Sequence, residues 1–213
     1  MREAIAGGLR YLLSLPAGGE PAPLLCFLHG YDEAAPMPLE RGVTKHGPLR
    51  TGSAAIARDS FVIVAPQLPR AGDLWLRYAD AVLEIIASAA NATRVDPSRR
   101  YLTGFSFGGN GVFELGGAHP DFWAALWAVD PTRVPREPPP LPVWLSMGQV
   151  ARIRSKGFVQ TLGLVDATTL ASASLAHTDR VFTDEGHDHV GSATHAYADT
   201  RCYEWLLARR SGQ

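Results

Sequence analysis

The sequence predicts a three-layer α/β domain, with a mostly parallel central sheet and helices on both faces. Short apolar runs recur along the chain, and several are apolar at every position, as in strands that are buried on both faces. Helical patterns lie between these runs. Strand and helix that alternate in this way are typical of a parallel sheet covered by helices.

The expected strands follow one another at short intervals, and an antiparallel arrangement stays open for the first of them. They lie at residues 8–15, 23–30, 60–67, 100–106, 124–130, 142–148 and 178–184. Further helices are expected at 108–117 and from about Ala196 to Arg210. The clearest helical pattern covers residues 73–91, with one apolar face formed by Leu76, Ala79, Leu83, Ile86 and Ala90.

Two segments read as loops. Residues 131–142 are too rich in proline for a helix or a strand and predict a stiff surface loop. Residues 31–52 are long and irregular, come directly after a strand, and are a candidate wall or lid of a site. The sequence has no internal repeats, so we expect one domain over residues 1–213.

Charge and composition exclude several classes of function. The chain has 20 basic and 21 acidic residues and no basic run, so nucleic acid is not an expected partner. No stretch approaches the roughly 20 apolar residues that span a bilayer, and no membrane association is expected. The N-terminus does not resemble a signal peptide, and the two cysteines are too few for a disulfide framework. We expect a cytoplasmic protein.

A candidate nucleophile stands at Ser106. Residues 104–108, Gly-Phe-Ser-Phe-Gly, match G-x-S-x-G, in which a serine occupies a strained turn between a strand and a helix. A strand pattern precedes this serine and a helical pattern follows it. The alternatives are a glycine-rich turn without chemistry or a phosphate cradle, although the glycine signatures of phosphate loops are missing.

A serine hydrolase also needs backbone donors for the oxyanion and a base for the hydroxyl proton. The stretch Leu28-His29-Gly30-Tyr31 ends an early strand, where such a fold places one donor. We expect the N–H groups of Tyr31 and Phe107 to form the oxyanion hole, and His29 to be structural.

The order of several motifs resembles the α/β-hydrolase superfamily, in particular phospholipase/carboxylesterase-like and polyhydroxybutyrate-depolymerase-like esterases known as predicted peptidases. The similar pieces are LRYLLSLP, LLCFLHG with KHGPL after it, FVIVAPQ, VDPSRRYLTGFSFGGNGVFELGGAHPDFWAAL, PVWLSMG, and GHD followed by AYADTRCYEWLL. They cover nearly the whole chain. The resemblance implies an α/β-hydrolase fold without a large cap domain.

By this resemblance the base is the histidine of the GHD stretch, His187, which follows the last strand. His189 and His195 are close rivals. The stretch His187-Asp188-His189 with His195 is also open to interpretation as a metal cluster, although no cysteine or helical HExxH supports a metal.

The sequence departs from the family at the third member of the triad. Where the family has an aspartate after the strand PVWLSM, this chain has Ala151. Asp130 ends the preceding strand and is the replacement candidate, with a simple turn residue as the alternative. Asp184, Glu185 and Asp179 are nearer to His187 in sequence and rank lower.

These residues predict a serine esterase that needs no cofactor and no metal and acts on a small-molecule ester. A non-catalytic binding protein on the same fold, a thioesterase or peptidase, and a lyase or cyclase remain alternatives, and Ala151 argues for the first of them. Oligomeric state cannot be read from this sequence. Aromatic residues near the strand ends are candidates for walls of the site or for plain core: Tyr31, Trp75, Phe105, Phe107 and Trp127.

Overall fold

The computed structural model describes residues 1–17 and 21–212. Across these residues, nine strands form one sheet in the order β1-β2-β4-β3-β5-β6-β7-β9-β8. The strands are β1 (Arg2–Ala6), β2 (Leu9–Ser14), β3 (Ala22–Leu28), β4 (Val62–Pro66), β5 (Val95–Phe105), β6 (Ala125–Val129), β7 (Val143–Met147), β8 (Val165–Asp166) and β9 (Arg180–Asp184).

The sheet is mixed, with its antiparallel part at the start of the chain. β1 pairs antiparallel with β2, and β2 antiparallel with β4, whereas every other pairing is parallel. All seven expected strands are confirmed. The two unexpected ones carry weak signals, because β1 is largely exposed and β8 has two residues.

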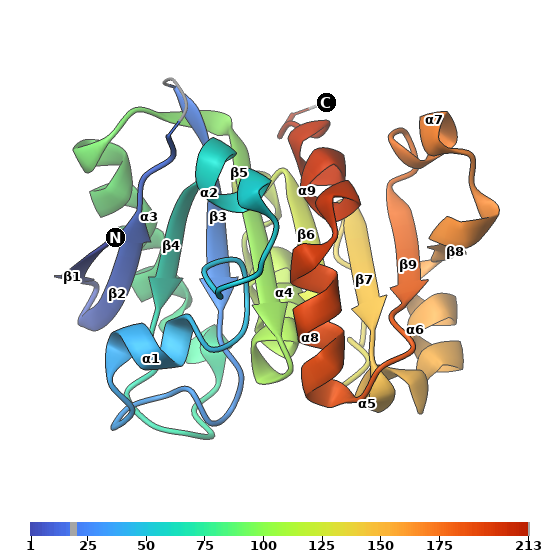
Figure 1. Ribbon diagram of the computed structural model, residues 1–213, viewed down its shortest axis with the longest axis horizontal. Coiled ribbons are helices and arrows are strands. Elements are labelled where there is room, and N and C mark those ends of the chain that lie inside the picture. Colours follow the sequence, from blue (N-terminus) through green and yellow to red (C-terminus); the bar gives the residue numbers. More distant parts are fainter. Residues whose placement is uncertain (18–20, 213) are drawn as a thin grey trace.

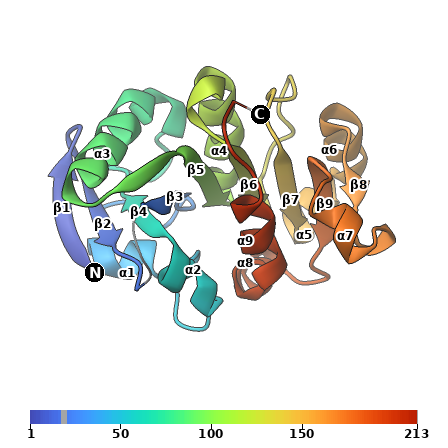
Figure 2. The same cartoon turned by 90° about the horizontal axis from the view of Figure 1, so that it is seen from above.

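Helices cover both faces of the sheet (Figure 2). On one face lie α3, α4 and α6, and on the other α1, α2, α8 and α9, each face with its own buried apolar cluster. The helices are α1 (Leu39–Val43), α2 (Ala55–Ser60), α3 (Ala79–Ala92), α4 (Phe107–Ala118), α5 (Gln149–Arg152), α6 (Ser155–Leu162), α7 (Ser172–Leu175), α8 (His189–Ala198) and α9 (Thr200–Leu207), with short 3-10 turns η1 (Trp75–Tyr78), η2 (Pro120–Phe122) and η3 (Ala167–Thr169).

The helical pattern at 73–91 divides into two elements, and its buried face differs from the expected one. The 3-10 turn η1 comes first, so the α-helical phase starts afresh at Ala79. Leu76 and Ala90 are consequently exposed. The buried stripe of α3 consists of Ala79, Val82, Ile85, Ile86 and Ala89.

The single helix expected from about Ala196 to Arg210 is two helices. The first, α8, begins earlier, at His189, and ends at Ala198. Asp199 interrupts the pattern because its side chain caps α9, accepting a hydrogen bond from the N–H of Arg201 at 2.9 Å.

Helix α4 lies directly against the sheet because its glycines allow close approach. A Cβ on Gly108 would collide with the carbonyl group of Leu28 at the end of β3. In Figure 1, the carboxyl ends of β3, β5 and β6 lie along one edge of the sheet, and α4 starts there. This packing brings the start of α4 next to the loop that follows β3.

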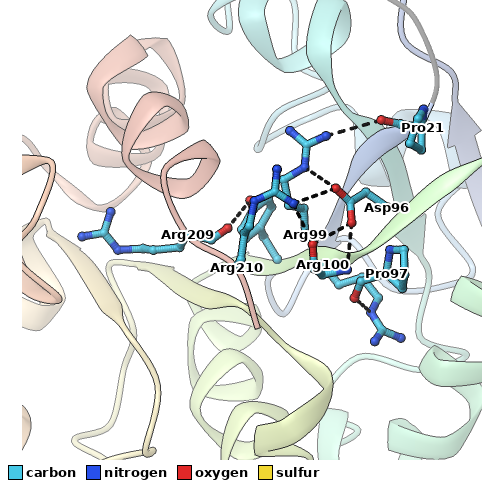
Figure 3. Close-up of polar contacts among 9 residues, drawn as sticks. Pro21, Asp96, Pro97, Arg99, Arg100, Arg209 and Arg210 are labelled. Atoms are coloured by element: carbon cyan, nitrogen blue, oxygen red, sulfur yellow. Dashed lines mark hydrogen bonds and ion pairs between the residues drawn. The ribbon is translucent and has the colours of Figure 1, made fainter. Parts of the chain in front are cut away.

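The opposite end of the sheet is held by Asp96 (Figure 3). Its carboxylate accepts hydrogen bonds from Ser98, from Arg99 at 2.7 Å and from Arg210 at 3.0 Å. Burial alone would raise the pKa of Asp96, but these hydrogen bonds outweigh it and lower the pKa. The start of β5 is thereby joined to the end of the chain.

Residues 131–142 contain no helix or strand, as expected. Residues 31–52 are irregular apart from α1. In the described part of the chain, no helix has both the length and the apolar character needed to cross a membrane.

Candidate active site

Ser106 occupies the turn between β5 and α4 and has a backbone φ of 58°. A positive φ is unfavourable for a serine, and such strain is characteristic of a G-x-S-x-G elbow. The turn is fixed by two main-chain hydrogen bonds: the N–H of Ser106 donates to Val129 at 2.9 Å, and its carbonyl accepts from Asn110 at 3.2 Å.

The side chain of Ser106 belongs to a chain of hydrogen bonds that ends on Asp130. The hydroxyl oxygen lies 2.9 Å from Nε2 of His189, and Nδ1 of the same ring lies 2.6 Å from Oδ2 of Asp130. Asp130 is fully buried, whereas the His189 side chain is 30% exposed. The three residues come from three elements: the turn after β5, the end of β6 and the first residue of α8.

Asp130 is held in place by the main chain of the segment that follows β7. Its Oδ1 accepts from the N–H groups of Gly148 at 2.9 Å and Ala151 at 2.7 Å, and its Oδ2 from that of Val150 at 3.3 Å. Ala151, at the position where the resemblance implied a carboxylate, therefore supplies a backbone donor to Asp130. The carboxylate that faces His189 comes instead from the end of the neighbouring strand β6.

Asn110 supports the loop behind Asp130. Its Oδ1 accepts from the N–H groups of Thr132 and Arg133 at 3.0 Å, and its Nδ2 donates to the Thr132 hydroxyl at 2.7 Å. Asp130 itself has a φ of 41°, which is unusual for an aspartate. The hydrogen bonds of Asn110 fix the backbone of the residues that follow Asp130 in the chain.

The structure brings His189, and not His187, to Ser106. The side chain of Asp188 accepts a hydrogen bond from the N–H of Gly191 at 2.6 Å and caps α8, so His189 is the first helical residue. His187 precedes the cap, is exposed, and stacks on His195 with ring centroids 3.6 Å apart. Among the described residues, no three potential ligands are grouped so that they could hold a metal ion.

The three carboxylates that ranked below Asp130 have other partners. Arg152 donates to both oxygens of Asp184, the hydroxyl of Thr183 donates to Glu185 at 2.7 Å, and Asp179 lies 3.5 Å from Arg209.

The main-chain N–H groups of Tyr31 and Phe107 have no hydrogen-bond acceptor among the residues that the structure describes. The two residues flank the serine turn, and their rings meet edge to face with centroids 5.3 Å apart. Tyr31 is 48% exposed. The other three candidate wall residues, Trp75, Phe105 and Trp127, are buried.

His29 is structural, as expected. Nε2 of its ring accepts from the N–H of Leu68 at 3.0 Å, and Nδ1 donates to the carbonyl of Gly30 at 2.6 Å. Burial lowers the pKa of His29 to about 4, so the ring is neutral near pH 7. Both nitrogens are occupied in holding the loop after β3.

Sequence reasoning missed a polar cluster in the irregular segment 31–52. Glu33 is buried, and its Oε1 accepts from Nζ of Lys45 at 2.9 Å and lies 3.6 Å from Nε2 of His46. The ring of His46 packs on Phe105, with centroids 5.0 Å apart, and Phe105 packs on His189. A signal for this cluster existed in the KHG stretch, but nothing local connected it to Glu33.

No family model matches this chain, and no curated protein matches it by sequence. Solved structures are similar to it in fold. A thermostable esterase is 21% identical with a TM-score of 0.68, and the match covers 95% of this chain and 59% of that one.

Two further similar structures cover nearly all of this chain. A serine-to-alanine mutant of the feruloyl esterase module from Clostridium thermocellum, complexed with sinapinate, is 12% identical with a TM-score of 0.67, covering 98% of this chain and 86% of that one. A ferulic acid esterase is 15% identical with a TM-score of 0.63, and the match covers 96% of this chain and 95% of that one. This chain therefore has the α/β-hydrolase fold that these esterases share.

Proposed function

We propose that this protein is a serine hydrolase that cleaves a carboxylic ester through an acyl-enzyme on Ser106. His189 is the base in place of His187, Asp130 orients it, and the N–H groups of Tyr31 and Phe107 bind the oxyanion. The observation that carries this proposal is the continuous hydrogen-bond path from the Ser106 hydroxyl through both nitrogens of one imidazole to a buried carboxylate.

The direction of proton transfer follows from this path. Because Nδ1 of His189 faces a carboxylate, Nδ1 carries the ring proton, and Nε2 presents a lone pair to the Ser106 hydroxyl. Asp130 also stabilises the imidazolium that forms during the reaction. Its four hydrogen-bond partners prevent it from turning away.

The reaction has two halves. In the first, Oγ of Ser106 bonds to the ester carbonyl carbon while Nε2 of His189 takes its proton, and the carbonyl oxygen becomes an oxyanion. The oxyanion collapses, the bond to the alcohol oxygen breaks, and His189 protonates the alcohol. In the second half, water attacks the acyl-enzyme through the same base, the acid leaves, and the proton returns to Ser106.

The exposure of the site residues indicates which class of substrate to test first. His189 is partly exposed and Tyr31 is nearly half exposed, which suits a small or extended ester rather than an enclosed one. Because similar folds carry the titles feruloyl esterase and ferulic acid esterase, the first substrate panel includes short-chain and hydroxycinnamoyl esters.

The test is covalent labelling of the serine. Wild-type protein and Ser106→Ala are incubated with a fluorophosphonate, and intact mass is measured beside hydrolysis of p-nitrophenyl acetate. The expected result is one adduct and turnover with wild type and neither with the variant. Folded wild-type protein that forms no adduct and shows no turnover would overturn the proposal and favour a binding protein on the same fold.

A further inference from the structure

Glu33 is a buried carboxylate beside the candidate active site, and the reaction described above does not use it. It is 4% exposed. Its main-chain carbonyl accepts a hydrogen bond from Gln67 at 2.9 Å, so the backbone at this position is fixed. Of the two carboxylate oxygens, Oε1 faces Lys45 at 2.9 Å and His46 at 3.6 Å.

The other oxygen, Oε2, has no hydrogen-bond donor among the described residues. The surroundings of Gly30 show where Oε2 lies relative to Ser106. A Cβ placed on Gly30 would stand 2.7 Å from Oε2 of Glu33 and 3.5 Å from both Cβ of Ser106 and a ring carbon of Phe105. This oxygen therefore lies on the side of Gly30 that faces the nucleophile.

His46 adds a second atom without a partner. Its ring is 7% exposed, and Nδ1 is buried and makes no hydrogen bond among the described residues. Because Nε2 faces the Glu33 carboxylate, Nε2 carries the proton of the neutral ring, and Nδ1 is an acceptor. Burial, with the charges of Lys45 and Arg50, lowers the pKa of His46 to about 4 and keeps the ring neutral.

Both atoms without partners are thus hydrogen-bond acceptors. Of the two, Nδ1 of His46 is a fully buried atom, and native proteins nearly always pair such an atom with protein, water or ligand. We propose that Glu33, supported by His46, recognises a hydrogen-bond donor on the substrate, a hydroxyl or an ammonium group one or two atoms from the scissile carbonyl carbon. This inference rests on the proposed ester hydrolysis at Ser106.

The competing explanation is that Glu33 only anchors Lys45 to the loop after β3. The Lys45 side chain is 42% exposed, and an ion pair with an exposed lysine stabilises weakly. The two explanations differ in what they predict for substrates. An anchor affects all esters alike, whereas a recognition group distinguishes esters with a donor from those without one.

The experiment uses three p-nitrophenyl esters that differ in one substituent on the α-carbon: 2-methylpropanoate with a methyl group, 2-hydroxypropanoate with a hydroxyl, and 2-aminopropanoate with an ammonium. The hydroxy and amino esters are used as separate enantiomers. For each ester kcat/KM is divided by its rate with hydroxide in solution, which removes intrinsic reactivity. The proteins are wild type, Glu33→Gln and the matched control Lys45→Gln, each with its melting temperature.

We expect wild type to favour the hydroxy or the amino ester over the methyl ester by about tenfold or more, since a hydrogen bond to a charged group contributes about 1.5–3 kcal/mol. The ester with the larger preference, hydroxy or amino, identifies whether the recognised donor is a hydroxyl or an ammonium group. Glu33→Gln should lose most of this ratio, and Lys45→Gln should keep it. A wild-type ratio near one for both donors overturns the inference even if the variant does not fold. If Glu33→Gln lowers the rates of all three esters alike and keeps the ratio, the inference is overturned in favour of the anchor, whereas no turnover of any ester contradicts the proposed function itself.

Discussion

Asp130→Asn is the sharpest perturbation of the proposed triad, because the structure specifies how the new amide must lie. The N–H groups of Gly148 and Ala151 both point at Oδ1, so the amide oxygen is held there. The amide NH₂ then faces Nδ1 of His189 and the N–H of Val150. Nδ1 becomes an acceptor, the ring proton moves to Nε2, and the base can no longer take the proton of the serine.

The expected loss in kcat is about 10⁴, the size found when a triad aspartate becomes asparagine in serine proteases. The donor facing Val150 adds a stability loss of about 1–3 kcal/mol. Both follow from wrong hydrogen-bond polarity rather than from lost volume.

The assay is steady-state hydrolysis of p-nitrophenyl acetate, with melting temperature measured on the same samples. Asp184→Asn is the matched control, because Asp184 pairs with Arg152 at the surface, and we expect it to change kcat less than about threefold. If Asp130→Asn retains activity within tenfold of wild type while folded, Asp130 does not orient the base and the reasoning fails.

Three further outcomes follow. His189→Ala should abolish turnover and fluorophosphonate labelling, whereas His187→Ala, its matched control, should retain both; the reverse pattern would restore His187 as the base. Stability should be fully present above about pH 6.5 and fall as the pH drops toward 4, because unfolded histidines bind protons that folded His29 and His46, with pKa values of about 4, do not. Between these pH values His29 alone should change the free energy of unfolding by about 1 kcal/mol per pH unit. Thermal melting from pH 8 to 5 measures this change, and a melting temperature that does not vary with pH would contradict the prediction. Asp96→Asn should lower the melting temperature by a few degrees, about 1–2 kcal/mol, and leave kcat unchanged, because its hydrogen bonds hold the far end of the sheet; an unchanged melting temperature would show that these contacts contribute little.

Ser106 and the histidine beside it illustrate what the local sequence predicts and what it leaves open. Ser106 was predictable because a strained elbow needs small neighbours on both sides, and those neighbours are adjacent in sequence. The choice between His187 and His189 depended on where α8 begins. Asp188 decides that by capping the helix through Gly191, three residues further on.

The contacts of Asp130 and of the cluster around Glu33 depended on residues that are far apart in the sequence. Asp130 was one of several candidate carboxylates, and it meets His189 only because β6 ends beside β7 and the segment after β7 presents three N–H groups to it. Glu33 and His46 are thirteen positions apart in an irregular segment. No periodic pattern predicts such a contact, since the loop conformation is set by packing against the rest of the chain.

The sequence by itself therefore determined the order of strands and helices, the parallel character of most of the sheet, and the turn that carries Ser106. These features depend on hydrophobic periodicity and on the backbone requirements of neighbouring residues, which are local. Only the tertiary structure decided which histidine and which carboxylate meet the serine, and that Glu33 lies beside it. Hydrogen bonds between side chains require atoms about 3 Å apart, and that precision arises when separate strand ends and helix starts converge on one edge of the sheet.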